Sequence, residues 1–556
     1  MPVVNILKTR IKSVFPNKNI ENILEKLPFL GLDIEGIDKE KIRVEYNPNR
    51  PDYSSDTGIF RSLKGLLNEK LGLPIFKYCS TKSYEITLDP EVKKIRPILL
   101  FFVAKNKKIN NFILNQLISM QEDLHNGIAR GRKKAAIGIH DLNTLDFPLT
   151  YNTKGQDVSF IPLDQTKPFK FPEILSTLEV GKKYRNLFRN LQQYPTIVDR
   201  NNQIISFPPI INSNNTKIND KSHNLLIEIT GTNLETCKSI LAILAYYLYD
   251  EGYKIFSGII HDDKLTFSSL KLLKDNAFLI DPNVIKSYLG LNLSAEEIRQ
   301  ILNRCRIDVS LTNKKKVKCL VPSYRNDIIN SIDIVEEVAL GYGIDNIKPT
   351  LPSFLISAGA RNKYFRKIDE IKETLIGLGF LEMVNFTLLD QTISTIFNLE
   401  DKGLLEKIKV NESKSKEHEF LRTNILSSLI KNLSYNIHEE YPQKLFEIGK
   451  TFNFKNNILE QWNLGIIIAS SNKSNYTEAK AIVQSIFKIN FGKHISTRRN
   501  DNNNLFLEGR CAEILYDSKP IGVIGEIKPD LIAKFNLHIP LSAFELNLSP
   551  LLKIEC

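Results

Sequence analysis

The sequence predicts a multidomain protein of the α+β class. Its 556 residues exceed what one hydrophobic core organises, because single cores stop growing at about 250 to 300 residues. Hydrophobic residues make up 42% of the chain and include 30 Phe and 19 Tyr, which is enough to fill several cores. Strand-length apolar runs alternate with longer segments of helical periodicity. We therefore expect four domains, over residues 1–82, 85–265, 270–350 and 355–556.

Composition restricts the class of protein further. The longest purely apolar run, Ile240–Tyr249, is about half of what a bilayer crossing needs, so no membrane span is expected. The first residues mix charges into an apolar run, which argues against secretion. Six scattered cysteines without a CxxC pair fit reduced thiols in a cytoplasm. The formal charge of +12 is consistent with a polyanionic partner, and equally with simple cationic solubility.

The first block has a strand that runs into a helix (VVNILKTRI), then two strands, a turn and a second helix. Turn-forming residues gather in NPNRPD, residues 47–52, and we expect a structural role for this segment. Ser54 or Ser55 is positioned to cap the following helix. The apolar side chains of that helix, Ile59, Leu63 and Leu66 or Leu67, recur at helical spacing.

The second block alternates strands with helices, as in ILLFFVAKN, a helix over residues 110–126, KAAIGIHDLNTL, LLIEITGT and LETCKSILAILAYYLYDEG. Arg130, Arg132, Lys133 and Lys134 make a basic group beside two glycines. Such a group is either a solvated face or a contact for phosphate.

The third block carries a group of acids in VPSYRNDIINSIDIVEEVALGYGIDN. Asp333, Glu336 and Glu337 stand at i, i+3 and i+4 at a predicted helix start, and Asp327 lies just upstream. Crowded carboxylates need a positive partner, and oxygen-only ligands suit Mg²⁺. The alternative is an acidic, solvated first turn with Arg325 as an ion-pair partner. In the same block Ser294 and Glu297 form a capping box.

The fourth block begins with a predicted helix, RNKYFRKIDEIKETLIGLGF, followed by a strand, LEMVNFTLLD. The helix places Tyr364, Ile368, Ile371, Leu375 and Leu378 on one face.

These motifs resemble those of one family over nearly the whole chain. PSYRNDIINSIDIVEEVALGYGIDNI is similar to the signature of the B5 domain in the β subunits of phenylalanyl-tRNA synthetases. The resemblance implies that Asp327, Asp333, Glu336 and Glu337 hold a Mg²⁺ ion at the contact with an α subunit. The NPNRPD segment is similar to an N-terminal motif of the same subunit, of the shorter archaeal or eukaryotic type.

RGRKKAAIGIHDLNTL, IISFPPIIN and LLIEITGTNLET resemble that family's editing domain, which hydrolyses tyrosine wrongly attached to the phenylalanine tRNA. A second pocket is needed because an apolar site for phenylalanine cannot strongly reject an analogue that adds a hydroxyl. The resemblance places Glu228 at the site, where the family usually has Asp, to accept the phenolic proton. Thr230 and Ser206 add hydroxyls, and His140 is a candidate for orienting water. Without the family, His140 is read more simply as a structural hydrogen bonder.

The last block resembles a class II synthetase catalytic domain, with its first helix and strand as motif 1. An ATP-handling site of that class has an Arg-x-Glu in motif 2 and a glycine-rich stretch ending in Arg in motif 3, and neither is found. Arg422 in FLRT and Glu447 in LFEIG are poorly placed substitutes. We expect a catalytic-like fold without the ATP-site arginines.

The resemblance implies a cytoplasmic β subunit that acts with an α subunit, two of each per complex, to join phenylalanine to tRNA(Phe). ATP and phenylalanine would be held by the α subunit. This chain would supply assembly, tRNA contact, Mg²⁺ binding and editing. Two alternatives remain: a synthetase-like scaffold without activity, and a freestanding hydrolase of mischarged tRNA.

Overall fold

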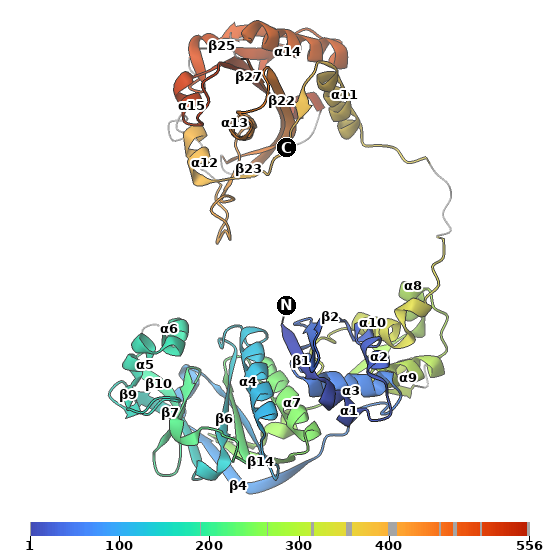
Figure 1. Cartoon of the computed structure of the whole chain (residues 1–556), viewed down its shortest axis with the longest axis vertical. Coiled ribbons are helices and arrows are strands. Elements are labelled where there is room, and N and C mark those ends of the chain that lie inside the picture. The colour runs from blue at the N-terminus through green and yellow to red at the C-terminus, as the bar shows by residue number, and fades with distance from the viewer. Residues whose placement is uncertain are drawn as a thin grey trace. The chain divides into compact units, whose positions relative to one another are not determined.

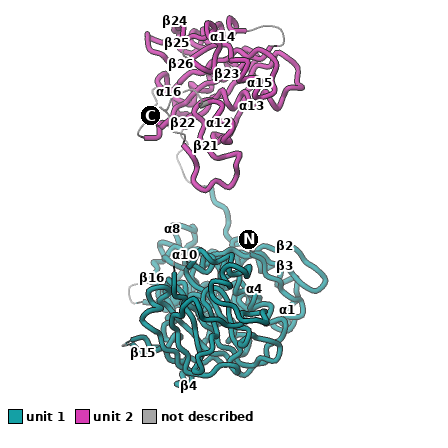
Figure 2. The backbone as a smooth tube through the Cα atoms, turned by 90° about the vertical axis from the view of Figure 1, so that its left-hand side faces the viewer, with its two compact units in different colours: residues 1–351 teal, residues 352–556 magenta. Residues whose placement is uncertain are grey.

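The computed structural model describes residues 2–188, 191–263, 265–312, 316–351, 358–398, 408–454, 457–470, 475–500 and 503–552. The chain divides into two compact units, Met1–Leu351 and Pro352–Cys556 (Figure 2). Every cluster of buried apolar side chains draws its residues from one unit only, so each unit has its own cores. Within these described ranges, no helix is long and apolar enough to cross a membrane.

The first unit begins with a three-stranded antiparallel sheet in the order β1-β3-β2 (Figure 1). Ser55 caps α3 by accepting a hydrogen bond from the Gly58 amide at 3.2 Å, which confirms one of the two predicted caps. Ile59, Leu63 and Leu66 of α3 are buried as their spacing predicted. The elements are β1 (Val3–Leu7), α1 (Lys8–Val14), α2 (Ile20–Leu24), β2 (Leu32–Ile37), β3 (Lys41–Tyr46) and α3 (Asp56–Leu66).

A 10-stranded mixed sheet follows, in the order β12-β11-β10-β7-β4-β14-β5-β13-β6, with β15 paired to β14. Its first strand begins at Tyr78, inside the range expected for the preceding block. The elements are β4 (Tyr78–Leu88), β5 (Ile98–Lys105), α4 (Asn111–Asn126), β6 (Ala135–Asp141), β7 (Leu149–Gly155), β8 (Ser159–Phe160), β9 (Phe169–Lys170), α5 (Phe171–Thr177), α6 (Glu179–Tyr184), β10 (Gln193–Val198), β11 (Ile204–Phe207), β12 (Ile211–Asn212), β13 (Leu225–Gly231), α7 (Leu234–Asp250), β14 (Lys254–Asp262) and β15 (Leu265–Phe267).

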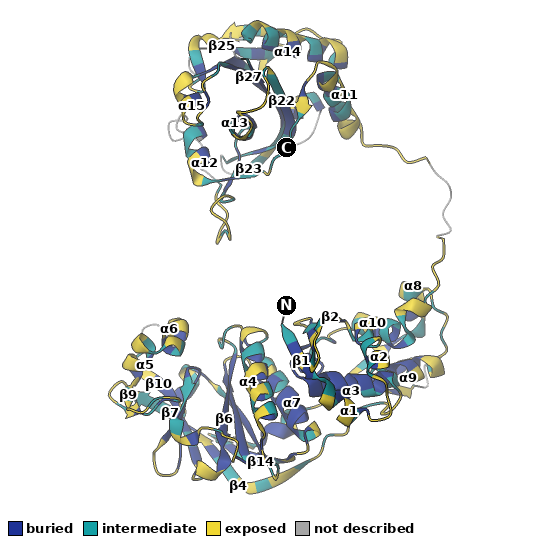
Figure 3. Cartoon of the chain, viewed as in Figure 1, coloured by how far each residue is buried: buried dark blue, intermediate teal, exposed yellow. Residues whose placement is uncertain are grey.

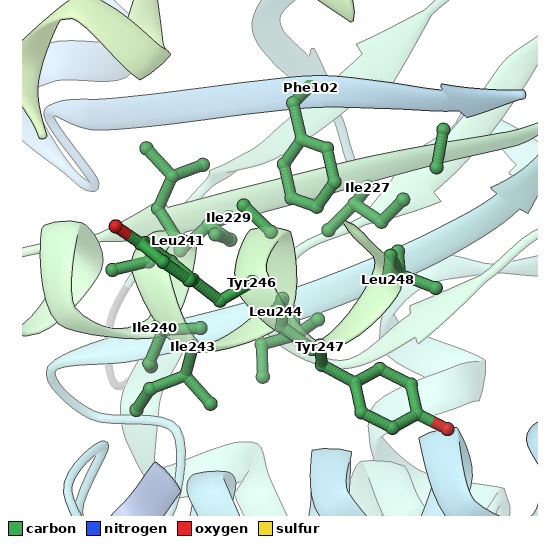
Figure 4. Close-up of a cluster of buried hydrophobic side chains, with 14 of the residues drawn as sticks. Phe102, Ile227, Ile229, Ile240, Leu241, Ile243, Leu244, Tyr246, Tyr247 and Leu248 are labelled. Carbon is green, nitrogen blue, oxygen red and sulfur yellow. The ribbon is translucent and has the colours of Figure 1, made fainter. Parts of the chain in front are cut away.

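The two faces of this sheet have different surroundings. Helices α4 and α7 cover one face, where Ile227 and Ile229 of β13 pack against α7 (Figure 4). Leu226 belongs to a separate apolar cluster on the opposite face. Because side chains alternate along a strand, Glu228 and Thr230 also lie on that opposite face. Figure 3 shows that α7 and strand β6 are largely buried.

The third group of elements has a three-stranded antiparallel sheet in the order β16-β18-β17, packed against three helices. Ser294 and Glu297 form the predicted capping box at the start of α9. The elements are β16 (Asn276–Ile280), α8 (Pro282–Leu289), α9 (Ala295–Arg304), β17 (Asp308–Leu311), β18 (Val317–Val321) and α10 (Ser331–Tyr342).

The second unit is built on a seven-stranded sheet, β19-β22-β23-β27-β26-β25-β24, with helices on both faces. Helices α11 and α14 cover one face, and α12, α13 and α15 the other. The elements are α11 (Lys363–Gly377), β19 (Leu381–Glu382), β20 (Leu388–Leu389), α12 (Gln391–Asn398), β21 (Phe420–Leu421), α13 (Leu426–Tyr435), β22 (Gln443–Phe454), β23 (Ile458–Ala469), α14 (Tyr476–Phe491), β24 (Ser496–Arg499), β25 (Phe506–Tyr516), β26 (Lys519–Ile527), α15 (Pro529–Ala533), β27 (Leu541–Asn547) and α16 (Ser549–Leu552).

Two expectations for this unit were wrong in detail. Ile368, Ile371 and Leu375 of α11 are buried, but Tyr364 and Leu378 are each more than a third exposed. The buried stripe is therefore narrower than predicted. The single strand expected over LEMVNFTLLD is two short strands, β19 and β20, which pair with different partners, β22 and β21.

Candidate functional site

Three of the four side chains predicted for one site come together inside the 10-stranded sheet, and the fourth, that of Thr230, lies two residues from Glu228 on the same face of its strand. Glu228 and Thr230 lie on β13, His140 on the neighbouring strand β6, and Ser206 on β11 near the opposite end of the strand order. The Ser206 hydroxyl donates to Glu228 Oε1 at 3.0 Å, and His140 Nε2 lies 3.9 Å from the same oxygen. Side chains from both ends of the sheet can meet in this way only if the sheet curls.

The meeting of the two ends is secured by further hydrogen bonds. The Asn212 amide on β12 donates to the Ile139 carbonyl on β6 at 3.4 Å. Arg132, which precedes β6, donates to the carbonyls of Pro209 and Ile210 at 3.1 and 2.8 Å. Glu228 therefore lies within a sheet that closes on itself, and only 2% of this residue is exposed.

A glycine makes room for the Glu228 carboxylate. Gly138 on β6 is the register partner of Glu228. A Cβ atom added to Gly138 would stand 2.3 Å from Glu228 Oε1, far inside van der Waals contact. Residue 138 must therefore be glycine, because the Glu228 side chain on the neighbouring strand occupies the space that a Cβ atom would need.

The protonation of His140 follows from its neighbours. Its Nδ1 lies 2.8 Å from Thr216 Oγ1, and the Thr216 hydroxyl donates to the Ser213 carbonyl at 3.2 Å. Because that hydroxyl proton is already used, Thr216 Oγ1 accepts from the N–H at His140 Nδ1. In the neutral ring this assignment leaves a lone pair on Nε2, on the side that faces Glu228.

Two buried acceptor atoms at this place lack hydrogen-bond partners. Glu228 Oε2 and His140 Nε2 are both closed to solvent, and no residue in the described part of the chain donates to either. An unpaired buried polar group costs about 1–3 kcal/mol, so such groups point to a functional role or to a bound donor. A water molecule placed beside the pair could donate to both atoms, whereas a single hydroxyl could donate to only one of them.

Thr230 is held by an arginine that the sequence did not single out. Arg96 donates from Nε to Thr230 Oγ1 at 2.9 Å and from Nη2 to the Thr230 carbonyl at 2.7 Å. Burial lowers the pKa of the Arg96 guanidinium, an effect that the nearby charge of Glu228 partly offsets. Arg96 stands alone between Ile95 and Pro97 with no motif around it, so no sequence signal marked it.

The other polar residues around the site have structural partners. Asp141 accepts from the Asn143 amide and from the Ser222 hydroxyl. Of the basic group at residues 130–134, Arg132 pairs with Glu122 at 2.8 Å, whereas Arg130 and Lys133 are exposed. The alternative of a solvated face therefore describes Arg130 and Lys133 but not Arg132.

Arg325 organises two of the four acids of the third block. It donates to Asp327 at 2.9 and 2.7 Å and to Glu337 at 3.1 and 2.5 Å, and all three residues are largely buried. The two carboxylates therefore share one guanidinium. On the far side, Arg50 of the NPNRPD segment makes two bonds to Asp52 and lies 3.8 Å from Asp327. This pairing gives the segment the structural role expected of it.

The other two acids have separate surroundings. Asp333 Oδ2 accepts from the Ile329 and Asn330 amides, both at 2.7 Å, and so caps α10. Glu336 is exposed, and Glu337 turns inward to Arg325. Over the residues that the structure describes, no group of three or more His, Cys, Asp or Glu side chains is arranged to hold a metal ion. The four carboxylates thus do not form a ready-made Mg²⁺ site.

Comparison with known proteins explains these motifs. The sequence model of the tRNA synthetase B5 domain matches residues 278–344, and that of the phenylalanyl tRNA synthetase beta chain CLM domain matches residues 347–548. The phenylalanine–tRNA ligase β subunit of Archaeoglobus fulgidus is 36% identical, over 99% of this chain and 98% of the relative. Those of Methanosphaera stadtmanae and Methanocaldococcus jannaschii are each 34% identical, over 99% of this chain and 100% of the relative. The chain belongs to the family of phenylalanine–tRNA ligase β subunits.

A solved structure from this family matches the first unit. A crystal structure of an N-terminal fragment of the phenylalanyl-tRNA synthetase β subunit from Pyrococcus horikoshii aligns with a TM-score of 0.58 at 26% identity. The alignment covers 61% of this chain and 99% of the fragment. The resemblance predicted from the sequence, to β subunits of the archaeal or eukaryotic type, is confirmed.

Within the family's CLM domain, Arg422 and Glu447 form a buried ion pair. Arg422 Nη1 lies 2.6 Å from Glu447 Oε1, and Arg422 Nε donates to the Lys450 carbonyl at 2.9 Å. Gly449 admits the guanidinium, since an added Cβ would lie 2.2 Å from Arg422 Nη2. The two side chains thus join the segment that follows β21 to strand β22.

Proposed function

We propose that this chain is the β subunit of a phenylalanine–tRNA ligase, which joins phenylalanine to tRNA(Phe) with ATP. Full-length similarity to relatives of that name supports the proposal. In it, an α subunit holds ATP and phenylalanine, two α and two β chains assemble, and this chain contributes to tRNA contact. The sequence lacks the class II arginine motifs, and Arg422 is already paired with Glu447. Both observations support a division of roles in which the α subunit, and not this chain, handles ATP.

We further propose that the first unit hydrolyses tyrosine from mischarged tRNA(Phe). One observation carries this proposal: the buried oxygen Oε2 of the Glu228 carboxylate has no donor among the described residues, and the other oxygen, Oε1, lies 3.9 Å from His140 Nε2. A tyrosyl hydroxyl would donate to Glu228 Oε2. Phenylalanine would leave that oxygen buried and unpaired, at a cost of about 1–3 kcal/mol, so the pocket selects tyrosine.

The remaining side chains suit positioning roles. Ser206 donates to Glu228 Oε1 and so fixes the carboxylate, and Arg96 fixes Thr230. The lone pair of His140 Nε2 can accept a hydrogen bond from a water molecule and orient it toward the ester carbonyl. In the hydrolysis, the water oxygen bonds to that carbon, the ester bond to the tRNA ribose breaks, and the ribose oxygen takes the proton. All four residues are at most 2% exposed, so a ligand reaches them only after covering residues move.

Hydrolysis of Tyr-tRNA(Phe) by the complex tests the editing proposal. Glu228→Ala should lower the rate by about 10-fold to 100-fold, the equivalent of one hydrogen bond to a charged group. Glu235→Ala is the matched control, because the Glu235 side chain is 79% exposed on α7. Phenylalanylation should be the same in both variants. Undiminished hydrolysis in Glu228→Ala would remove this residue from the site.

The purified single chain separates the two alternatives. Hydrolysis without a partner would favour a freestanding editing enzyme. Aminoacylation that depends on a co-purifying partner, together with hydrolysis, would favour the β-subunit assignment. Neither activity would favour a scaffold.

A Mg²⁺ ion bound by Asp327, Asp333, Glu336 and Glu337 remains a proposal. Their oxygen donors suit the ion chemically, but two of the four are paired with Arg325. A site would have to be completed at the contact with the partner subunit. Mg²⁺ titration of the α–β complex by calorimetry tests it with Glu336→Gln, because Glu336 is exposed and has no partner in the described chain. Unchanged Mg²⁺ affinity in that variant would exclude Glu336 from the site.

A further inference from the structure

A cavity of about 760 Å³ opens at the place where the three groups of elements in the first unit meet. Helices α1 and α3 supply one wall, and the C-terminal end of α7 supplies another. The segment that leads into β4, residues 70–77, and Arg306 after α9 complete the lining. None of the proposed editing residues lies here.

The lining is strongly cationic. Two acidic residues face the cavity, Asp250 and Glu251, against seven basic ones: Arg10, Arg61, Lys64, Lys70, Lys77, Lys107 and Arg306. Like charges this close repel one another unless anions offset them. The positive charge left for a ligand therefore depends on which cations are already paired with the two acids.

Both acids are already paired with cations of the lining. Asp250 accepts from Arg61 Nε at 2.6 Å. Glu251 accepts from Arg10 at 2.5 Å and from the Thr57 hydroxyl at 2.6 Å, and it also pairs with Lys107 at 3.4 Å. The other four cations, Lys64, Lys70, Lys77 and Arg306, make no ion pair with any residue that the structure describes.

Arg306 is the most unusual of these four. Only 6% of it is exposed, and its Nε is buried without a hydrogen-bond partner within the described ranges. Gly65 of α3 allows the end of α9 to approach closely, since an added Cβ would stand 2.1 Å from the Arg304 carbonyl oxygen and 2.9 Å from Arg306 Cδ. Burial also lowers the pKa of the Arg306 guanidinium. A buried, unpaired guanidinium is costly, and a bound anion would remove that cost.

We propose that this cavity binds the phosphate group of a nucleotide. A guanidinium fork with three lysines around it matches a multiply charged tetrahedral anion better than a single carboxylate. Leu71 and Ile75 are 53% and 71% exposed on the same lining, and they offer an apolar surface to a ribose or base next to the phosphate. The phosphate belongs either to a tRNA backbone or to a free nucleotide.

Binding of inorganic phosphate to the full chain, measured by calorimetry at low ionic strength, tests the site without reference to the proposed function. Wild type should bind one phosphate saturably, and Arg306→Gln and Lys70→Gln should each weaken binding about tenfold, as expected for losing one charge-assisted hydrogen bond. Lys70 is exposed, so its variant keeps the fold. Lys18→Gln, an exposed lysine away from the cavity, should leave binding unchanged.

Measurements of tRNA binding distinguish the two sources of the phosphate. If the phosphate comes from tRNA, Arg306→Gln should weaken binding of tRNA(Phe) transcript by a similar factor and flatten its salt dependence. If tRNA binding is unchanged while phosphate and AMP binding fall, the ligand is a free nucleotide. No saturable phosphate binding, or equal affinity in wild type and both cavity variants, would overturn the proposal.

Discussion

Glu228 can occupy its position only because its partner across the ladder has no side chain. Its carboxylate lies over Gly138, takes a hydrogen bond from Ser206 and faces His140. Two strands that are neighbours in the sheet and one that closes the curl supply these contacts. A single residue therefore reports on both the pairing of β6 with β13 and the closure of the sheet.

Gly138→Ala should displace the Glu228 carboxylate, because the new Cβ would lie 2.3 Å from Oε1. We expect unfolding by urea to show a loss of about 1–3 kcal/mol, the usual cost of overpacking. Glu228→Ala in the same chain should return most of that loss. Additive effects of the two substitutions would mean that the glycine is needed for some other reason.

The site residues divide clearly into those that sequence predicts and those that it does not. Glu228, Thr230, Ser206 and His140 stand in motifs, and the structure brings the side chains of Glu228, Ser206 and His140 together, with Thr230 two residues along the same strand. Arg96 and Thr216 stand in no motif. They reach Thr230 and His140 across 134 and 76 residues of sequence, through strand pairing and sheet curl that one sequence does not encode locally.

The ion pairs of Arg325 should stabilise the folded chain more at neutral pH than in acid. Burial alone would raise the pKa of Asp327, but Arg50 and Arg325 outweigh it and lower that pKa to about 2. A folded-state pKa below the ordinary value gives stability that is fully present above about pH 4 and is lost as the pH falls through about 2. From the size of the pKa change, this contribution is on the order of 2 kcal/mol.

Arg325→Gln should therefore cost about 3–5 kcal/mol at pH 7, because two carboxylates are left buried without their cation. The gap between variant and wild type should narrow below about pH 4. Thermal unfolding between pH 3 and pH 7 measures it. Arg43→Gln, which breaks an exposed pair with Glu35, is the control and should cost less than about 1 kcal/mol throughout. A gap for Arg325→Gln that does not change with pH would contradict the ion-pair account.

At the scale of elements, the start of α10 shows how the same spacing supports two outcomes. The i, i+3, i+4 pattern predicted three acids on adjoining parts of one helix face. In the structure, Asp333 caps the helix, Glu336 stays in solvent and Glu337 turns to Arg325. The ion-pair alternative left open by the sequence describes Asp327 and Glu337 better than a shared metal site does.

Asp333→Ala should destabilise the first unit by about 0.5–2 kcal/mol, because it removes the acceptor of two backbone amides at the start of α10. Asp333→Asn should recover part of that loss, since its carbonyl oxygen still accepts. Glu336→Ala should change stability by less than about 0.5 kcal/mol. Urea unfolding of each single variant measures these losses. Equal losses of stability in Asp333→Ala and Glu336→Ala would contradict the capping role.

Helices were predicted more faithfully than short strands. The helix expected over residues 110–126 is α4, capped by Asn110, because its apolar period and cap lie within the segment itself. LEMVNFTLLD was read as one strand but forms two, since Leu381 and Leu388 pair with different partners elsewhere in the chain. Strand length depends on such distant partners, which a local pattern does not contain.

At the scale of the whole molecule, the sequence predicted four domains, and only one of the expected breaks, between residues 350 and 355, falls where the chain divides into its two compact units. The closure of the 10-stranded sheet was not predicted. Closure of the sheet depends instead on bonds such as that from Asn212 to Ile139, which join its two ends. The break in the chain follows from the local sequence, whereas closure of the sheet follows from contacts between strands that are far apart in the sequence.

Because its apolar clusters are all internal, the first unit should fold without the second. Residues 1–351 expressed alone should unfold in one cooperative transition or a few, and should keep the proposed hydrolysis of Tyr-tRNA(Phe), since Glu228, His140, Ser206 and Thr230 all lie within it. The crystallised N-terminal fragment from Pyrococcus horikoshii, which aligns over 61% of this chain, supports independent folding.

Neither this fragment nor the full chain alone should form an aminoacyl adenylate from ATP, because Arg422 in the second unit is committed to Glu447. Circular dichroism, a hydrolysis assay and ATP–pyrophosphate exchange measure the three properties. The fragment carrying Glu228→Ala is the control, and it should fold equally well without hydrolysing the ester. A folded fragment that has lost hydrolysis would show that the second unit or a partner completes the editing site. Adenylate made by the isolated full chain would contradict the proposed division of work between the α and β subunits.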